Sequence, residues 1–69
     1  MATSYTGYIR MLDKDSGLIR ILEENESVSR ELSLGKNLNA IQEAAQALSS
    51  HMLVHLWEKE DGTFQIRLV

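Results

Sequence analysis

The stretch that most constrains this chain is residues 8–22, YIRMLDKDSGLIRIL, which reads nearly the same in both directions. Its centre, DKDSG, joins acidic and small residues that form Asx-type bonds to a glycine that tolerates positive φ, as turns require. Apolar residues alternate with others on both sides, so the stretch predicts a β-hairpin with one buried face. The expected pairs are Leu12 with Leu18, Met11 with Ile19, Arg10 with Arg20, Ile9 with Ile21, and Tyr8 with Leu22.

This register turns the isoleucines and Met11 toward a core and sets Arg10 opposite Arg20 on the outer face. Like charges directly opposite each other destabilise a sheet by a fraction of a kcal/mol. We therefore expect an anionic neighbour for the two arginines. Within the chain, Glu31 and the acidic stretch 23–26 are the candidates.

A third strand is predicted over residues 28–34, after a polar and acidic turn at 23–27. Val28, Leu32 and Leu34 would share its apolar face by period-two alternation. Arg30 interrupts that face, which is typical of a strand that bends or lies at the edge of a sheet.

Residues 37–50 predict a helix, with Asn37 as its N-cap and Ser49-Ser50 near its end. Helical spacing defines an apolar stripe and an opposite, solvated face. The stripe would contain Leu38, Ile41, Ala44, Ala45 and Leu48, with Met52 following, and the solvated face Asn39, Gln42, Glu43 and Gln46.

A last hairpin is predicted from strands 52–59 and 63–69 around Glu60-Asp61-Gly62, a type I turn closed by a left-handed glycine. Pairing Lys59 with Thr63 makes both strands alternate consistently. A two-residue Asp-Gly turn, which shifts the register by one, is the alternative. The preferred register puts Val54, Leu56, Phe64, Ile66 and Leu68 inside, and His55, Trp57, Gln65 and Arg67 outside. Arg67 would then stack on Trp57 across the strands.

The first two strands are predicted over 6–12 and 18–23, so the element order is β-β-β-α-β-β in one domain, residues 1–69. This order resembles that of the OB-fold, a small, partly open Greek-key barrel. An SH3-like barrel, or an open α+β sheet packed on the helix, is the alternative. A chain of this size buries only about 60% of the surface it exposes when unfolded, and self-association would add buried area.

Composition narrows the class of protein. Apolar residues make up 43% and charged residues 25%, and there are no cysteines, which is a globular balance without disulfides or thiolate metal sites. The net charge of −3 argues against a dedicated DNA-coating protein, because such proteins are usually basic. No apolar run approaches the ~20 residues of a membrane helix, and MATSYTGY lacks the features of a signal peptide. We expect a cytoplasmic protein without membrane contact.

The motifs of catalysis and metal binding are incomplete. His51 and His55 match the outer letters of HExxH, but position 52 is Met and the helix ends there. Gly35-Lys36 precedes a helix without the spacing or the following hydroxyl of a P-loop. Carboxylates concentrate in turns, where solvent keeps them from the pKa shifts that acid–base catalysis uses. We expect no enzyme activity, no metal and no cofactor.

Aromatic residues and arginines on the outer faces of the two hairpins define the predicted binding site. Its members are Tyr8, Arg10, Arg20, Trp57 and Arg67. Trp, Tyr and Arg dominate protein interfaces, so the prediction is a small module for protein–protein interaction or homo-oligomerisation. The alternative is an OB-like protein that binds single-stranded nucleic acid, because basic groups interleaved with aromatic rings suit single strands.

Overall fold

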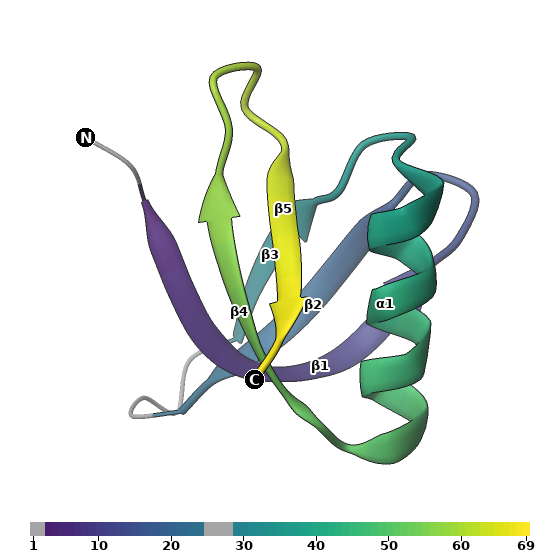
Figure 1. The fold of residues 1–69 in the computed structure, drawn as a ribbon, viewed down its shortest axis with the longest axis vertical. Coiled ribbons are helices and arrows are strands. Elements are labelled where there is room, and N and C mark those ends of the chain that lie inside the picture. The colour runs from purple at the N-terminus through teal and green to yellow at the C-terminus, as the bar shows by residue number, and fades with distance from the viewer. Residues whose placement is uncertain (1–2, 25–28) are drawn as a thin grey trace.

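The computed structural model describes residues 3–24 and 29–69 as an open five-stranded antiparallel sheet with one helix (Figure 1). The elements, in chain order, are β1 (Ser4–Asp13), β2 (Leu18–Glu23), β3 (Ser29–Ser33), α1 (Leu38–Ser50), β4 (Leu53–Glu58) and β5 (Phe64–Leu68). The predicted order β-β-β-α-β-β is confirmed. In space the strands follow the order β3-β2-β1-β4-β5, so β3 and β5 are the two edges. A barrel closed by hydrogen bonds between these edges is not confirmed within the described residues.

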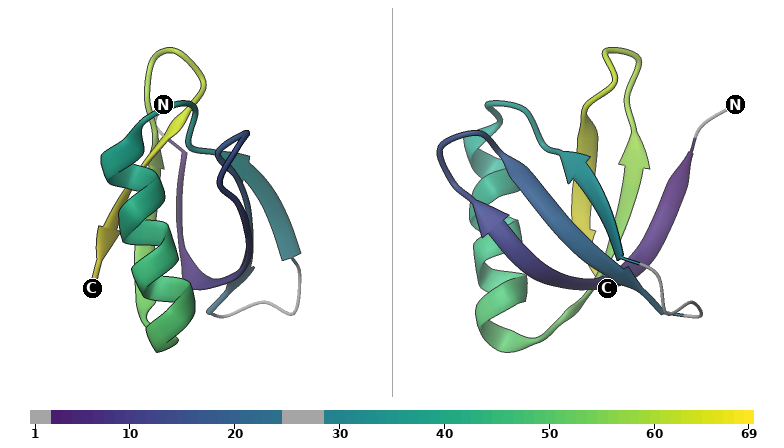
Figure 2. Two further views of the ribbon diagram at one scale, coloured as in Figure 1. Left: turned by 90° about the vertical axis from the view of Figure 1, so that its right-hand side faces the viewer. Right: turned by 180° about the vertical axis from the view of Figure 1, so that it is seen from behind.

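The central strand β1 pairs first with β4 and then with β2 along its length. Residues 4–8 pair with β4 and residues 7–13 pair with β2, and the strand bends sharply where the two stretches meet (Figures 1 and 2). Gly7 lies at this point. A Cβ atom on Gly7 would lie 2.2 Å from the carbonyl oxygen of Leu22, a distance too short for any side chain to be accommodated. The bend therefore requires glycine for steric reasons, and it folds the two halves of the sheet toward each other.

The first hairpin forms with a different register at its turn. The closing pair is Asp13 with Leu18, not Leu12 with Leu18, and the Gly17 N–H donates to the Asp13 carbonyl at 2.9 Å. The predicted Ile9–Ile21 and Tyr8–Leu22 pairs are confirmed. They form because a register shift between Ile9 and Met11 restores the expected alignment.

The predicted Arg10–Arg20 pair is therefore wrong. Arg10 is the extra residue of a β-bulge, and Met11 is aligned with Arg20. Leu12, aligned with Ile19, packs against the core, so Leu12 and Met11 exchange the faces that the sequence predicted for them. The turn is one residue shorter than expected, so the pairing of residues 11–13 with β2 is shifted by one. The bulge at Arg10 compensates for this shift, and Ile9 therefore keeps its expected partner.

Strand β3 lies at an edge of the sheet, as the charge at Arg30 predicted. Leu32 and Leu34 are buried, and Val28 lies outside the described residues. Arg30 lies at the margin of the core and stacks on an aromatic ring: its guanidinium is 4.9 Å from the centroid of the Tyr5 ring. Arg30 Nε also donates to the carboxylate of Glu23 on β2. The arginine is accommodated because its stem and its charge both have neighbours.

The helix begins where predicted. The Asn37 side chain accepts hydrogen bonds from the N–H groups of Asn39 at 3.1 Å and Ala40 at 3.3 Å, so it caps α1. Its buried face is rotated relative to the predicted stripe and consists of Ala40, Ile41, Ala44 and Ala47. Leu38 is 72% exposed, so its assignment to the core is wrong. Small alanines face the sheet because they let the helix approach β1 and β5 closely (Figure 2).

The last hairpin has the predicted register throughout. The Lys59 N–H donates to the Thr63 carbonyl at 2.8 Å, and the pairs His55–Arg67, Leu56–Ile66 and Trp57–Gln65 follow. Gly62 has a φ of 87°, as the three-residue turn requires. The inward side chains of both strands join one core with β1, β2 and α1. The helix of the described chain is neither long nor apolar enough to span a bilayer.

Replacing Gly7 by alanine tests the bend of β1. We expect Gly7→Ala to lower the free energy of unfolding by about 3 kcal/mol, because the methyl group meets backbone rather than a movable side chain. Urea denaturation measures the loss. Gly62→Ala is the matched control, since a Cβ there meets no atom within 4 Å. That variant bears only the strain of a left-handed backbone, about 1 kcal/mol, and an equal or larger loss at Gly62 would contradict the steric account of Gly7.

The end of the helix offers a stabilising substitution. His51 follows α1 with φ 52° and ψ 45°, a left-handed conformation that is strained for every residue type except glycine. His51→Gly is expected to raise the free energy of unfolding by about 0.5–1 kcal/mol, because glycine adopts this conformation without strain. Gln46→Gly, on the exposed side of the same helix, should instead lower it by about 0.5 kcal/mol. Thermal unfolding of both variants checks the contrast in sign.

Candidate binding face

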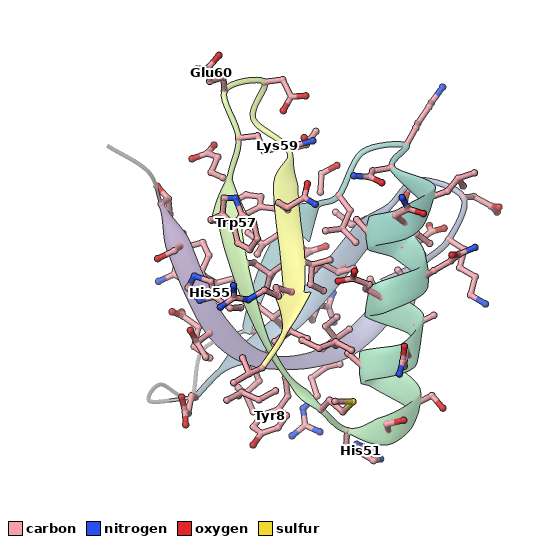
Figure 3. The ribbon with its side chains drawn as sticks, viewed as in Figure 1. Tyr8, His51, His55, Trp57, Lys59 and Glu60 are labelled. Atoms are coloured by element: carbon pink, nitrogen blue, oxygen red, sulfur yellow. The ribbon has the colours of Figure 1, made fainter. Side chains whose placement is uncertain are left out.

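The side of the sheet that faces away from α1 and the core is called here the outer face. Alternation along the paired strands assigns its members. They are Ser4, Thr6, Tyr8, Met11 and Asp13 of β1, Leu18, Arg20 and Leu22 of β2, Ser29, Glu31 and Ser33 of β3, Leu53, His55 and Trp57 of β4, and Gln65 and Arg67 of β5. Because β1 is bent, the outer face is convex, and Tyr8 lies at the outside of the bend (Figure 3).

An apolar row crosses this bend. Tyr8 is aligned with Leu22 on one neighbouring strand and with Leu53 on the other. The Tyr8 side chain is 39% exposed, and both leucines are half-buried. We call Leu22, Tyr8 and Leu53 the outer ridge. A tyrosine between two leucines presents a continuous apolar strip with one hydroxyl, a composition that suits a protein contact.

The slope formed by β4 and β5 carries an aromatic pair. The rings of His55 and Trp57 stack with their centroids 5.8 Å apart and their planes at 29° (Figure 3). Thr6 Oγ1 and His55 Nδ1 are hydrogen-bonded at 3.0 Å, which holds the imidazole against β1. Trp57 thus stacks on His55, and the expected stacking of Arg67 on Trp57 is not found among the described residues. Arg67 is aligned with His55 and is exposed.

The slope formed by β1 and β2 carries the other arginines. Arg20 Nη2 lies 3.9 Å from Glu31 Oε1 on β3, which confirms Glu31 as the neighbour that the sequence suggested. About half of each of these two side chains is exposed, so the pair adds little to stability. Within residues 3–24 and 29–69, neither Arg10 nor Arg67 forms an ion pair. Two exposed guanidinium groups therefore remain available beside the outer ridge, one on each slope.

Of the five residues predicted as a binding site, Tyr8, Arg20, Trp57 and Arg67 lie on the outer face, exposed or half-buried, and Arg10 is exposed at the bulge next to Met11. Sequence reasoning missed Leu53, which completes the outer ridge. The signal was present, because Leu53 has the same parity as His55 and Trp57 along the strand.

The two hairpin turns and their flanks contain five of the ten acidic residues of the chain. The β1–β2 and β4–β5 turns with their flanks contain Asp13, Asp15, Glu58, Glu60 and Asp61 against Lys14 and Lys59. The outer face carries Arg20 and Arg67 together with Glu31 and Asp13, and Arg10 is exposed at the bulge beside them.

The His51/His55 pair and the Gly35-Lys36 pair, the remaining sequence motifs, occupy structural positions in the fold. His51 ends the helix and His55 belongs to β4, and they point to different regions (Figure 3). In the described part of the chain, no group of three or more His, Asp or Glu side chains has the geometry to hold a metal ion. Gly35-Lys36 leads into the capped start of α1.

Comparisons with known proteins supply no relative. No protein-family model matches the sequence, no curated protein resembles it significantly, and no solved structure matches the fold significantly.

The acidic turn between β4 and β5 gives a prediction about pH. Asp61 Oδ1 accepts hydrogen bonds from the Thr63 hydroxyl at 2.6 Å and the Thr63 N–H at 2.9 Å. The hydroxyl first, and the N–H second, hold the pKa of Asp61 below its ordinary value. A carboxyl with a pKa lowered by folding adds stability above its unfolded-state pKa and loses that contribution as the pH falls through the folded-state pKa.

Thr63→Val removes the hydroxyl donor and keeps the backbone donor. We expect the pKa of Asp61 to rise toward its ordinary value and the decrease in stability between neutral and acidic pH to become smaller. Carboxyl-carbon NMR titration measures the pKa, and chemical denaturation at both pH values measures the stability difference. An unchanged titration midpoint would contradict the assigned role of the hydroxyl.

Proposed function

We propose that this chain is a small non-catalytic binding or assembly module that contacts another protein, or a second copy of itself, through its outer face. The observation that carries the proposal is the outer ridge, in which Tyr8 stays 39% exposed between two leucines. Interfaces concentrate their binding energy in such central aromatic residues surrounded by apolar and arginine side chains. The neighbouring His55–Trp57 stack extends the same apolar surface along β4.

The barrel interpretation belongs to this proposal. The strand order β3-β2-β1-β4-β5, with the helix between β3 and β4, supports an OB-like topology in which β3 and β5 would be the closing strands. Side chains span part of the distance between them: Arg30 of β3 lies over Tyr5, and Tyr5 contacts Phe64 of β5 with ring centroids 5.9 Å apart. A chain without cysteine suits a reducing compartment, so we propose a cytoplasmic location.

A second candidate function is binding of single-stranded nucleic acid. Arg10, Arg20 and Arg67 near Tyr8 and Trp57 favour it, because single strands need cations and stacking platforms. Against it stand the two hairpin turns. In OB-folds the corresponding loops contact oligonucleotides, whereas here they carry Asp15, Glu60 and Asp61 and would repel phosphate. The protein-contact function is therefore the preferred conclusion.

A photo-crosslinking amino acid at position 8 tests the proposed function. With p-benzoylphenylalanine in place of Tyr8, irradiation of cells that express the protein should give a discrete adduct, because a central interface residue lies against its partner. The same amino acid at Gln46, exposed on α1, is the matched control. Mass spectrometry of the adduct distinguishes a homodimer from a heterologous protein. Adducts at position 8 no stronger than at position 46 would contradict the proposal.

A further inference from the structure

The charges around the outer ridge restrict what a partner can be. On one side of the ridge, β1 and β2 present Arg10 and Arg20, and on the other side β5 presents Arg67. Arg10 and Arg67 have no ion-pair partner among the described residues, and Arg20 has one half-exposed neighbour, Glu31. The ridge is thus an apolar strip with an available guanidinium on each flank.

Resting on the proposed function, we infer that the partner is an acidic amphipathic helix, with an apolar stripe seated along the outer ridge and carboxylates on both borders of that stripe. Leu22, Tyr8 and Leu53 lie on three adjacent strands, so the ridge is about 10 Å long at a strand spacing of ~4.8 Å. A helix rising 1.5 Å per residue covers that length with about two turns. Arginine side chains on both slopes then reach carboxylates along the helix, where bidentate pairing fixes its position.

A second copy of this chain is a poorer occupant. Its own helix α1 has its apolar side buried against the sheet, and its exposed side carries Asn39, Gln42 and Gln46. A two-fold contact between outer faces would bring arginines toward arginines across the interface. Neither α1 of a second copy nor a second outer face offers an apolar stripe with acidic borders, which is the surface that would complement the ridge and its flanking arginines.

Trp57 is the chain's one tryptophan and lies on the outer face, so its fluorescence reports on this surface directly. The probe is a designed helical peptide without tryptophan, carrying leucines on one stripe and glutamates on both borders. Its matched control has lysine at every glutamate position. At low salt we expect the glutamate peptide to change the Trp57 emission saturably, with affinity falling as salt is added, and the lysine peptide to leave it unchanged.

Charge reversal supplies the decisive contrast. Arg10→Glu combined with Arg67→Glu is expected to weaken the glutamate peptide about tenfold, as two exposed ion pairs would, and to create binding of the lysine peptide. The control Lys14→Glu with Lys36→Glu makes the same change in net charge at two exposed loop positions away from the ridge. It should keep the original preference. Circular dichroism of both variants verifies folding, and Arg10→Ala with Arg67→Ala replaces the reversal if it does not fold.

The outcomes separate this inference from the proposed function. Equal response to both peptides, or no response to the glutamate peptide, overturns the acidic helix. If a labelled oligothymidylate binds in place of the peptide and is lost in the double reversal, the face recognises single strands instead. A strong adduct at position 8 with either of these peptide results would leave a protein-contact face whose partner has other chemistry. Absence of that adduct removes the proposed function itself.

Discussion

The close approach of Gly7 to the backbone of β2 is the constraint on which the rest of the structure depends. Without a side chain at Gly7, β1 passes the Leu22 carbonyl closely enough to bend and to pair first with β4 and then with β2. The bend brings inward side chains from all five strands to one core and lets α1 cover it with alanines. It also produces the convex apex on which Tyr8 is exposed. Core and candidate site are thus opposite sides of one feature.

The β-bulge at Arg10 has a comparable dual effect. Ile9 and Ile21 must face the core, whereas the turn after Asp13 sets its own alignment from the hydrogen bond to Gly17. The two requirements differ by one residue, and the extra residue takes up the difference. Because the residue at that position is arginine, the strand presents a charge at its surface without opposing it directly to Arg20. Arg20 is aligned instead with Glu31 and close enough to pair with it.

How well the sequence predicted each element depended on how firmly local chemistry sets the register. Around Asp61-Gly62, a glycine at the left-handed position and an aspartate that binds Thr63 leave one favourable turn, and the whole last hairpin follows. Around Asp13–Gly17, two turn lengths are chemically acceptable, and alternation alone does not reveal a bulge. The helix was located by its cap, but its buried side was not, since alanine and leucine at helical spacing leave the rotation of the helix to the surface it packs on.

The sequence by itself determined the order of the elements, the position of the two hairpins, the turn and register of the last one and the N-cap at Asn37, because short-range sterics and hydrogen bonds specify these features. Tertiary structure alone decided the bend at Gly7, the bulge at Arg10, the exposure of Leu38, and the alignment of Leu22, Tyr8 and Leu53 into a ridge. These depend on contacts between strands distant in the chain. Period-two alternation states which face a residue occupies, but not which residue of another strand lies beside it.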